Sequence, residues 1–124
     1  MANMKNIDAS AAARLKDEGA LMVDVREPGE YARMRIPGSV NIALSRLEGS
    51  ALPTTAGQKV VFFCASGNRT AVNASRLAAK AGKAPAFVMQ GGIFGWTGAG
   101  LPVETGRLAE EGGKQRGFFS RILG

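Results

Sequence analysis

The chain has 124 residues, 45% hydrophobic and 21% charged, which is enough for one globular domain but not for two, and no apolar run is long enough to span a membrane. One cysteine and no histidine exclude an internal disulfide and a Cys/His metal site; with no apolar secretory signal at the N-terminus, they predict a cytoplasmic protein without a cofactor. The net charge of +6 comes without any basic run interleaved with aromatic residues, so it favours small anions over nucleic acid as partners.

The N-terminal third predicts a helix, a strand and a turn. Asp8 is placed as the N-cap of a helix over 9–18, with Gly19 as its stop. Residues 20–25 form a short apolar run rich in strand formers, which predicts a buried strand. A turn and a short helix that begins near Pro28 or Gly29 should follow.

The remaining elements alternate between strands and helices. The turn signal Ile36-Pro37-Gly38 separates them from the first part of the chain. In order, the pattern predicts a strand over 39–42, a surface loop over 49–58, a strand over 59–63, a helix over 70–81 closed by Gly82, a strand over 86–89 and a short helix over 93–96.

This alternation predicts an α/β fold with a mostly parallel sheet and helices on both faces. We expect the domain to cover residues 5–104. Residues 105–124 are rich in glycine and charge, and we expect them to form a mobile tail outside the core. The apolar and basic residues near the C-terminus leave contact with a membrane or partner as the alternative for this tail.

The loop that joins the strand over 59–63 to the next helix predicts the chemistry. Cys64 follows the strand directly, at the edge where open α/β sheets bind ligands. Gly67 permits a left-handed turn that lets successive N–H groups point at one place, and Arg69 adds a positive charge. A thiol in this position is expected to have a lowered pKa and to react as the thiolate.

The missing histidine narrows the reaction. A cysteine–histidine hydrolase needs an imidazole to shuttle the proton, and this chain has none. Sulfur transfer needs no shuttle, because sulfite or a thiolate leaves as a stable anion. A persulfide on Cys64 is itself an anion, which the same N–H groups can hold.

Four segments in order resemble the rhodanese family. They are Leu21-Met-Val-Asp-Val-Arg-Glu-Pro-Gly-Glu-Tyr31, Arg35-Ile-Pro-Gly-Ser-Val-Asn-Ile42, Cys64-Ala-Ser-Gly-Asn-Arg-Thr70, and Gly91-Gly-Ile-Phe-Gly-Trp96 with Gly100-Leu-Pro-Val103. The resemblance covers roughly residues 5–103. It implies a sheet of about five strands and a single-domain sulfurtransferase.

The resemblance also implies roles for the loop residues. Cys64 would carry the persulfide, and the substrate would be bound by the following residues: Ala65, Ser66, Gly67, Asn68, Arg69 and Thr70. Donors would be thiosulfate or other small anionic sulfur compounds. Acceptors would be cyanide or a thiol, including a thioredoxin-like protein.

Two residues depart from the family pattern. Arg35 stands where many members have histidine, which we interpret as a packing change. Ala65 stands where members often have a larger polar or charged residue, so the choice of thiosulfate as donor is in question.

Other residues near the motifs are expected to be structural. Asp24 ends a strand, and Arg26 is placed to pair with Glu30 across the following turn. Trp96, in a glycine-rich turn beside apolar residues, is expected to anchor the core, with a place at the mouth of the site as the alternative.

Two rival functions remain. A phosphatase or arsenate reductase on the same fold needs five residues between cysteine and arginine, whereas four separate Cys64 from Arg69. A regulatory or sulfur-sensing module would keep the loop but turn over little. Neither the oligomeric state nor the natural donor and acceptor follows from the sequence.

Overall fold

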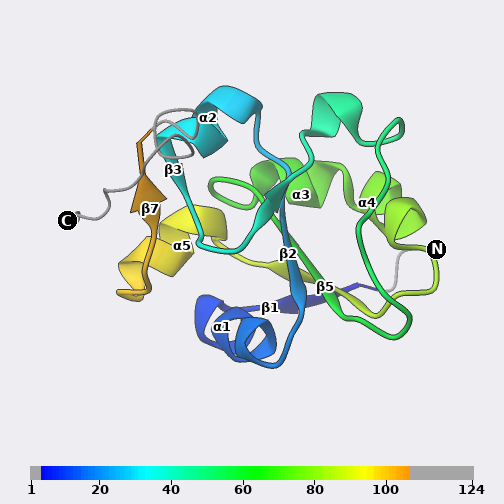
Figure 1. The fold of residues 1–124 in the computed structure, drawn as a ribbon, viewed down its shortest axis with the longest axis horizontal. Helices are drawn as coiled ribbons and strands as arrows, with labels where there is room; N and C mark the ends of the chain where they lie inside the picture. Colours follow the sequence, from blue (N-terminus) through cyan, green and yellow to red (C-terminus); the bar gives the residue numbers. More distant parts are fainter. Residues whose placement is uncertain (1–3, 107–124) are drawn as a thin grey trace.

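The computed structural model describes residues 4–106 and contains one central sheet of five parallel strands (Figure 1). The strand order is β1-β6-β5-β2-β4. The bounds are β1 (Lys5–Ile7), β2 (Leu21–Asp24), β4 (Val40–Asn41), β5 (Val60–Phe63) and β6 (Ala86–Met89). The predicted α/β class and parallel sheet are therefore confirmed.

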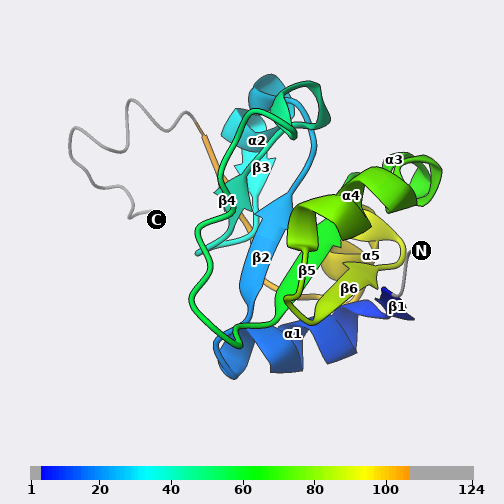
Figure 2. The same ribbon diagram turned by 90° about the vertical axis from the view of Figure 1, so that its right-hand side faces the viewer.

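Helices cover both faces of this sheet (Figure 2). One face packs against α1 (Ala9–Asp17) and α5 (Gly92–Gly98), and the other against α4 (Ala74–Ala81). The shorter helices α2 (Pro28–Arg33), η1 (Leu44–Arg46) and α3 (Asn68–Val72) lie in the connections that follow β2, β4 and β5. The Asp8 side chain caps α1 by accepting a hydrogen bond from the Ala11 N–H at 2.8 Å, as predicted.

Side chains on the two faces of β5 belong to two separate hydrophobic clusters. Val61 and Phe63 belong to the cluster under α1 and α5, while Phe62 and Cys64 belong to the cluster under α4. This alternation is the period of two that a strand imposes on its side chains. Cys64, directly after β5, is therefore buried in the cluster under α4.

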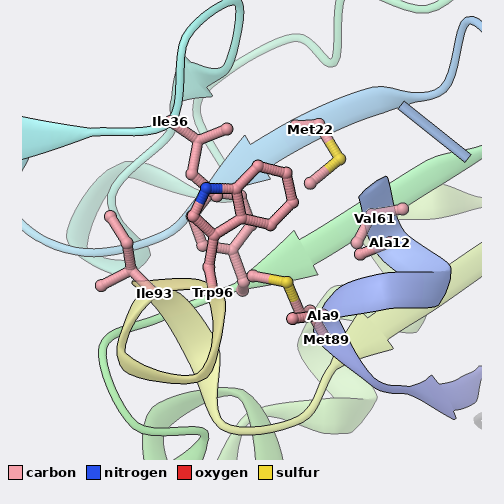
Figure 3. Packing of buried hydrophobic residues seen from close by; sticks show 9 residues of the cluster. Ala9, Ala12, Met22, Ile36, Val61, Met89, Ile93 and Trp96 are labelled. Carbon is pink, nitrogen blue, oxygen red and sulfur yellow. The ribbon is translucent and has the colours of Figure 1, made fainter. Parts of the chain in front are cut away.

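Trp96 anchors the first of these cores (Figure 3). Its side chain is buried together with Ile36, Met22 and Ile93, and its indole Nε1 donates a hydrogen bond to the Pro102 carbonyl at 2.8 Å. A tryptophan that buries its ring and satisfies its N–H stabilises the fold without facing a ligand. The expectation of a core anchor is confirmed.

The prediction of one continuous helix over 70–81 is wrong, because two helices occupy this segment. α3 begins at Asn68, and the helical run is interrupted at Asn73, before α4 begins. The Asn73 side chain donates a hydrogen bond to the Arg69 carbonyl at 2.8 Å. Asparagine competes with the helical backbone in this way, which explains the break.

Three short strands were not predicted. β1 supplies the fifth strand of the sheet, and β3 (Met34–Arg35) pairs antiparallel with β7 (Glu104–Thr105). Each of these segments has two or three residues, includes polar residues and lies in no apolar run, so the hydrophobic pattern does not mark it as a strand.

Arg35 joins β3 to the end of the described chain. Its guanidinium is buried, pairs with Glu104 at 3.3 Å and donates a hydrogen bond to the Gly106 carbonyl at 2.8 Å. This agrees with a packing role for the residue.

The tail predicted over 105–124 lies outside the described residues from position 107 onward. Within residues 4–106, no helix is both long and apolar enough to cross a membrane.

The pairing predicted for Arg26 and Glu30 is wrong. Arg26 binds Asp24 instead, through hydrogen bonds from Nε and Nη2 at 3.0 and 2.7 Å, and both side chains are buried. Arg26 Nη2 also donates to the Met34 carbonyl at 2.6 Å. The pair fixes the turn after β2, because a buried guanidinium is stable only when hydrogen-bond acceptors lie within reach of its N–H groups.

Asp24→Ala should be strongly destabilising. It leaves the Arg26 guanidinium buried without its carboxylate, and such a loss costs about 3–5 kcal/mol of unfolding free energy. Chemical denaturation followed by circular dichroism measures the change. Glu48→Ala serves as the control, because it breaks a solvent-exposed pair with Arg76 and should change little. Equal effects of the two substitutions would contradict the structural role of the buried pair.

Candidate active site

Cys64 lies at the carboxyl edge of the sheet, immediately after the central strand β5. In the sheet, β5 lies between β2 and β6. The segments that follow these three strands therefore meet at this edge. The Cys64 side chain is 0% exposed. A reagent can therefore reach Sγ only when the surrounding side chains move.

Gly67 and Thr70 hold the sulfur of Cys64. The Gly67 N–H donates a hydrogen bond to Sγ at 3.2 Å, and the Thr70 hydroxyl oxygen lies 3.8 Å from Sγ. Gly67 has a φ of 103°, the left-handed conformation predicted for it, which glycine adopts without strain. This turn brings the N–H back towards the sulfur three residues earlier.

Two opposing effects act on the pKa of the Cys64 thiol. Burial raises it by disfavouring the charged thiolate. Hydrogen bonds from the N–H groups of Thr70, Gly67 and Arg69 and from the Thr70 hydroxyl favour the thiolate and lower the pKa. The hydrogen bonds outweigh burial, so the pKa of Cys64 lies below its ordinary value.

The first turn of α5 fixes the start of the loop. Ile93 N–H donates to the Cys64 carbonyl at 2.9 Å, and Phe94 N–H donates to the Ala65 carbonyl at 3.0 Å. Gly92, with a φ of 56°, lets the backbone approach so closely that a Cβ there would overlap both carbonyls. The loop and α5 are therefore one structural unit.

Arg69 does not present a free charge to the thiol. Its guanidinium binds the Glu30 carboxylate of α2 through two hydrogen bonds, at 2.8 and 3.0 Å. This pairing lowers the pKa of Glu30 to about 2, chiefly through the Arg69 hydrogen bonds and against the effect of burial. The positive charge that the sequence placed near Cys64 is thus compensated by a residue of a different helix.

Other groups of the loop have no partner within residues 4–106. The N–H groups of Ala65 and Ser66 meet no acceptor within residues 4–106. The Ser66 and Asn68 side chains are exposed and make no hydrogen bond to that part of the chain. These groups are free to bind an added atom or ligand.

Sequence reasoning missed Glu30 and Gly92 as parts of the site. The charges at Glu30 and Arg69 were visible, but their pairing joins residues 39 positions apart, and a local partner for Glu30 was available in Arg26. The Gly91-Gly92 pair was visible as a turn, but its contact with the loop depends on the sheet order. Within residues 4–106, no group of three or more His, Cys, Asp or Glu residues is placed to hold a metal ion.

Comparison with protein families identifies the domain. The model of the rhodanese-like domain matches residues 8–99, which include the whole loop after Cys64. The chain belongs to the rhodanese-like family. The sequence resemblance seen in the four ordered segments is therefore confirmed.

Individual relatives differ in length and in name. The Synechocystis sp. protein slr1261 is 37% identical over 70% of this chain, which spans about half (48%) of that protein's length. The Saccharomyces cerevisiae thiosulfate:glutathione sulfurtransferase is 30% identical, with 79% of this chain and 84% of the relative covered. A solved Rhodopseudomonas palustris structure, described as a protein of unknown function and possible tyrosine phosphatase, matches with a TM-score of 0.67 and 30% identity over 82% of this chain and 85% of that one.

Substitutions in the Glu30–Arg69 pair should shift the thiol pKa in opposite directions. Arg69→Ala leaves the Glu30 carboxylate uncompensated near the thiolate and should raise the pKa, whereas Glu30→Gln leaves the guanidinium uncompensated and should lower it. The pH profile of Cys64 alkylation by iodoacetamide measures both. At a pH below the thiol pKa, we expect the rate to change roughly threefold in each direction. A shift of the same sign in both variants would contradict charge compensation.

Gly92→Ala should destabilise the protein by about 2 kcal/mol or more, because it adds a Cβ in a left-handed conformation against the Cys64 and Ala65 carbonyls. Gly98→Ala in the same helix is the control, since its Cβ would meet no atom within 4 Å. Urea denaturation of both variants gives the comparison. If Gly92→Ala were as stable as Gly98→Ala, the close contact between α5 and the loop would be ruled out.

Proposed function

We propose that this protein is a sulfurtransferase in which Cys64 accepts a sulfane sulfur as a persulfide and passes it to a thiol or to cyanide. The observation that carries the proposal is a buried thiol whose pKa is lowered by backbone N–H groups. Such a thiol is a ready nucleophile, and it needs no general base. The proposal fits a reducing compartment such as the cytoplasm, where the free thiol persists.

The first half-reaction uses only groups of the loop. The Cys64 thiolate attacks the outer sulfur of thiosulfate, an S–S bond forms, and the bond from that sulfur to the sulfonate breaks. Sulfite leaves with the bonding electron pair as a dianion, so no proton has to move. The unpaired N–H groups of Ala65 and Ser66 can then stabilise the charge on the outer sulfur of the persulfide.

The second half-reaction returns the enzyme to its starting state. The acceptor thiol gives its proton to the anionic persulfide, and the thiolate so formed attacks the outer sulfur. The S–S bond to Cys64 breaks, and the Cys64 thiolate leaves with the bonding electron pair. The N–H groups that lower the thiol pKa also make Cys64 a good leaving group, because the leaving rate rises as the pKa falls. The name of the S. cerevisiae relative supports this pair of reactions.

The charges around the loop favour donors of low charge over thiosulfate. Arg69 is already neutralised by Glu30, and Ala65 adds no cation. A thiosulfate dianion would have to rely on backbone N–H groups alone. A persulfide donor carries at most one negative charge on its sulfur, so less charge has to be removed from water when it binds.

A phosphatase is the second candidate, since the R. palustris structure carries that description. The loop of four residues between Cys64 and Arg69 and the engagement of Arg69 by Glu30 leave less room and less charge for a phosphate. Hydrolysis of an aryl phosphate without any sulfur transfer would support the phosphatase.

Sulfur loading tests the proposal directly. After incubation with thiosulfate or inorganic polysulfide, the intact mass should rise by one sulfur atom, and cyanide should remove the addition. Cys64→Ser should show no gain, because it lacks the nucleophile. An unchanged mass with both donors would favour a binding or sulfur-sensing module over an enzyme.

A further inference from the structure

A cavity of about 470 Å³ lies beside the sulfur-binding loop, on the face of the sheet covered by α3 and α4. Its walls come from the loop, from the start of α3 and α4, and from the end of the sheet formed by β1 and β6. The volume falls within the range of pockets that bind small molecules or short peptide segments, roughly 300–1,000 Å³.

The cavity shares two residues with the sulfur site. Gly67, whose N–H binds Sγ, and Thr70, whose hydroxyl lies 3.8 Å from Sγ, both line it. Cys64 itself does not line the cavity. A molecule in the cavity would therefore sit next to the sulfur without occupying the place of the sulfur.

Among residues 4–106, no charged residue lines this cavity, although the chain carries a net charge of +6. The Thr70 hydroxyl in its wall donates a hydrogen bond to the Gly67 carbonyl at 3.0 Å. The other polar groups are the side-chain amides of Asn6, Asn68 and Gln90 and the Ser66 hydroxyl. None of these side chains forms a hydrogen bond to any residue in 4–106. Each amide offers both donors and an acceptor, which is the set that pairs with peptide groups.

Two exposed apolar side chains lie on the helices that adjoin the sulfur-binding loop. Val72 is 82% exposed on α3, and Phe94 is 60% exposed on α5; they are the large apolar side chains that lie exposed within residues 4–106. α3 begins within the loop, whereas α5 follows β6 and contacts the loop through the Phe94 N–H, which binds the Ala65 carbonyl. Exposed apolar groups around a site are typical of a surface that meets another protein.

We propose that this cavity binds an uncharged peptide segment around the cysteine of a protein that accepts sulfur from Cys64. The inference rests on the proposed sulfurtransferase function and names its acceptor. Amide and hydroxyl side chains can satisfy the peptide groups of such a segment. Glutathione fits less well, because its two carboxylates would lose water and meet no cation in the cavity wall.

Transfer from loaded protein to defined acceptors tests the assignment. The full chain is loaded with inorganic polysulfide, and its loading is verified by intact mass. The acceptors are a pentapeptide with blocked ends, a central cysteine and no charge, the same peptide with aspartate on each side of the cysteine, and glutathione. Each rate is divided by the rate of that acceptor with a free low-molecular-weight persulfide, which removes differences in thiol reactivity.

The uncharged peptide should react at least about tenfold faster than the acidic peptide or glutathione after this correction. Gln90→Lys adds a cation to the cavity wall and should reduce the preference about fivefold in protein whose loading has been verified by intact mass. Ser10→Lys, at an exposed position of α1 on the opposite face of the sheet, is the control for net charge and should keep the preference.

Loaded protein that shows no preference, or the same preference in Gln90→Lys as in Ser10→Lys, would overturn the assignment while leaving the sulfurtransferase intact. A faster reaction with glutathione would also overturn it. Protein that takes up no sulfur at all would instead refute the sulfurtransferase function, and the acceptor assignment would fall with it.

Discussion

The hydrogen bonds from the first turn of α5 to the Cys64 and Ala65 carbonyls are the contact on which the site depends. They exist because β5 and β6 are parallel neighbours, so the segments that follow both strands leave the sheet at the same edge. In a trans peptide the N–H points away from the carbonyl. Once α5 binds these carbonyls, the N–H groups of Ala65 and Ser66 are turned away from α5 and meet no acceptor in the described part of the chain. Gly92 is the residue that allows this approach.

The reactivity of Cys64 follows from a balance between burial and backbone dipoles. The side chain lies in an apolar cluster with Phe62 and Leu77, where a thiolate is unfavourable. N–H groups of the loop and of the start of α3 reverse this preference. Because Glu30 neutralises Arg69, the backbone contributes more to the balance than any side-chain charge. A site of this kind suits a reaction in which both the nucleophile and the leaving group are anions and no proton has to be shuttled.

The parts of the structure that follow local rules could be predicted from the sequence. The parallel sheet, the Asp8 cap, the left-handed Gly67 and the place of Cys64 after a buried strand all depend on short-range patterns or on general rules of α/β folds. The break at Asn73 also has a local cause, but an asparagine inside a helical pattern competes with the backbone only when its side chain turns inward.

The features that escaped prediction depend on contacts between distant segments. The partner of Glu30 is decided by the packing of α2 against the loop, which no spacing in the sequence reveals. The cavity between the loop and the β1 edge likewise requires β1 to pair with β6, and a strand of three residues gives no pattern. The comparisons establish the family, whereas the acceptor proposed for the cavity comes from the chemistry of its walls.

The central claim is that backbone N–H groups lower the pKa of a buried cysteine below its ordinary value despite its burial. It is tested most directly by titrating the thiolate absorbance at 240 nm in the wild-type protein, with Cys64→Ser subtracted. The account predicts a midpoint below the value of about 8.5 for a cysteine in an unstructured peptide. A midpoint at or above that value would show that burial outweighs the hydrogen bonds and would contradict the account.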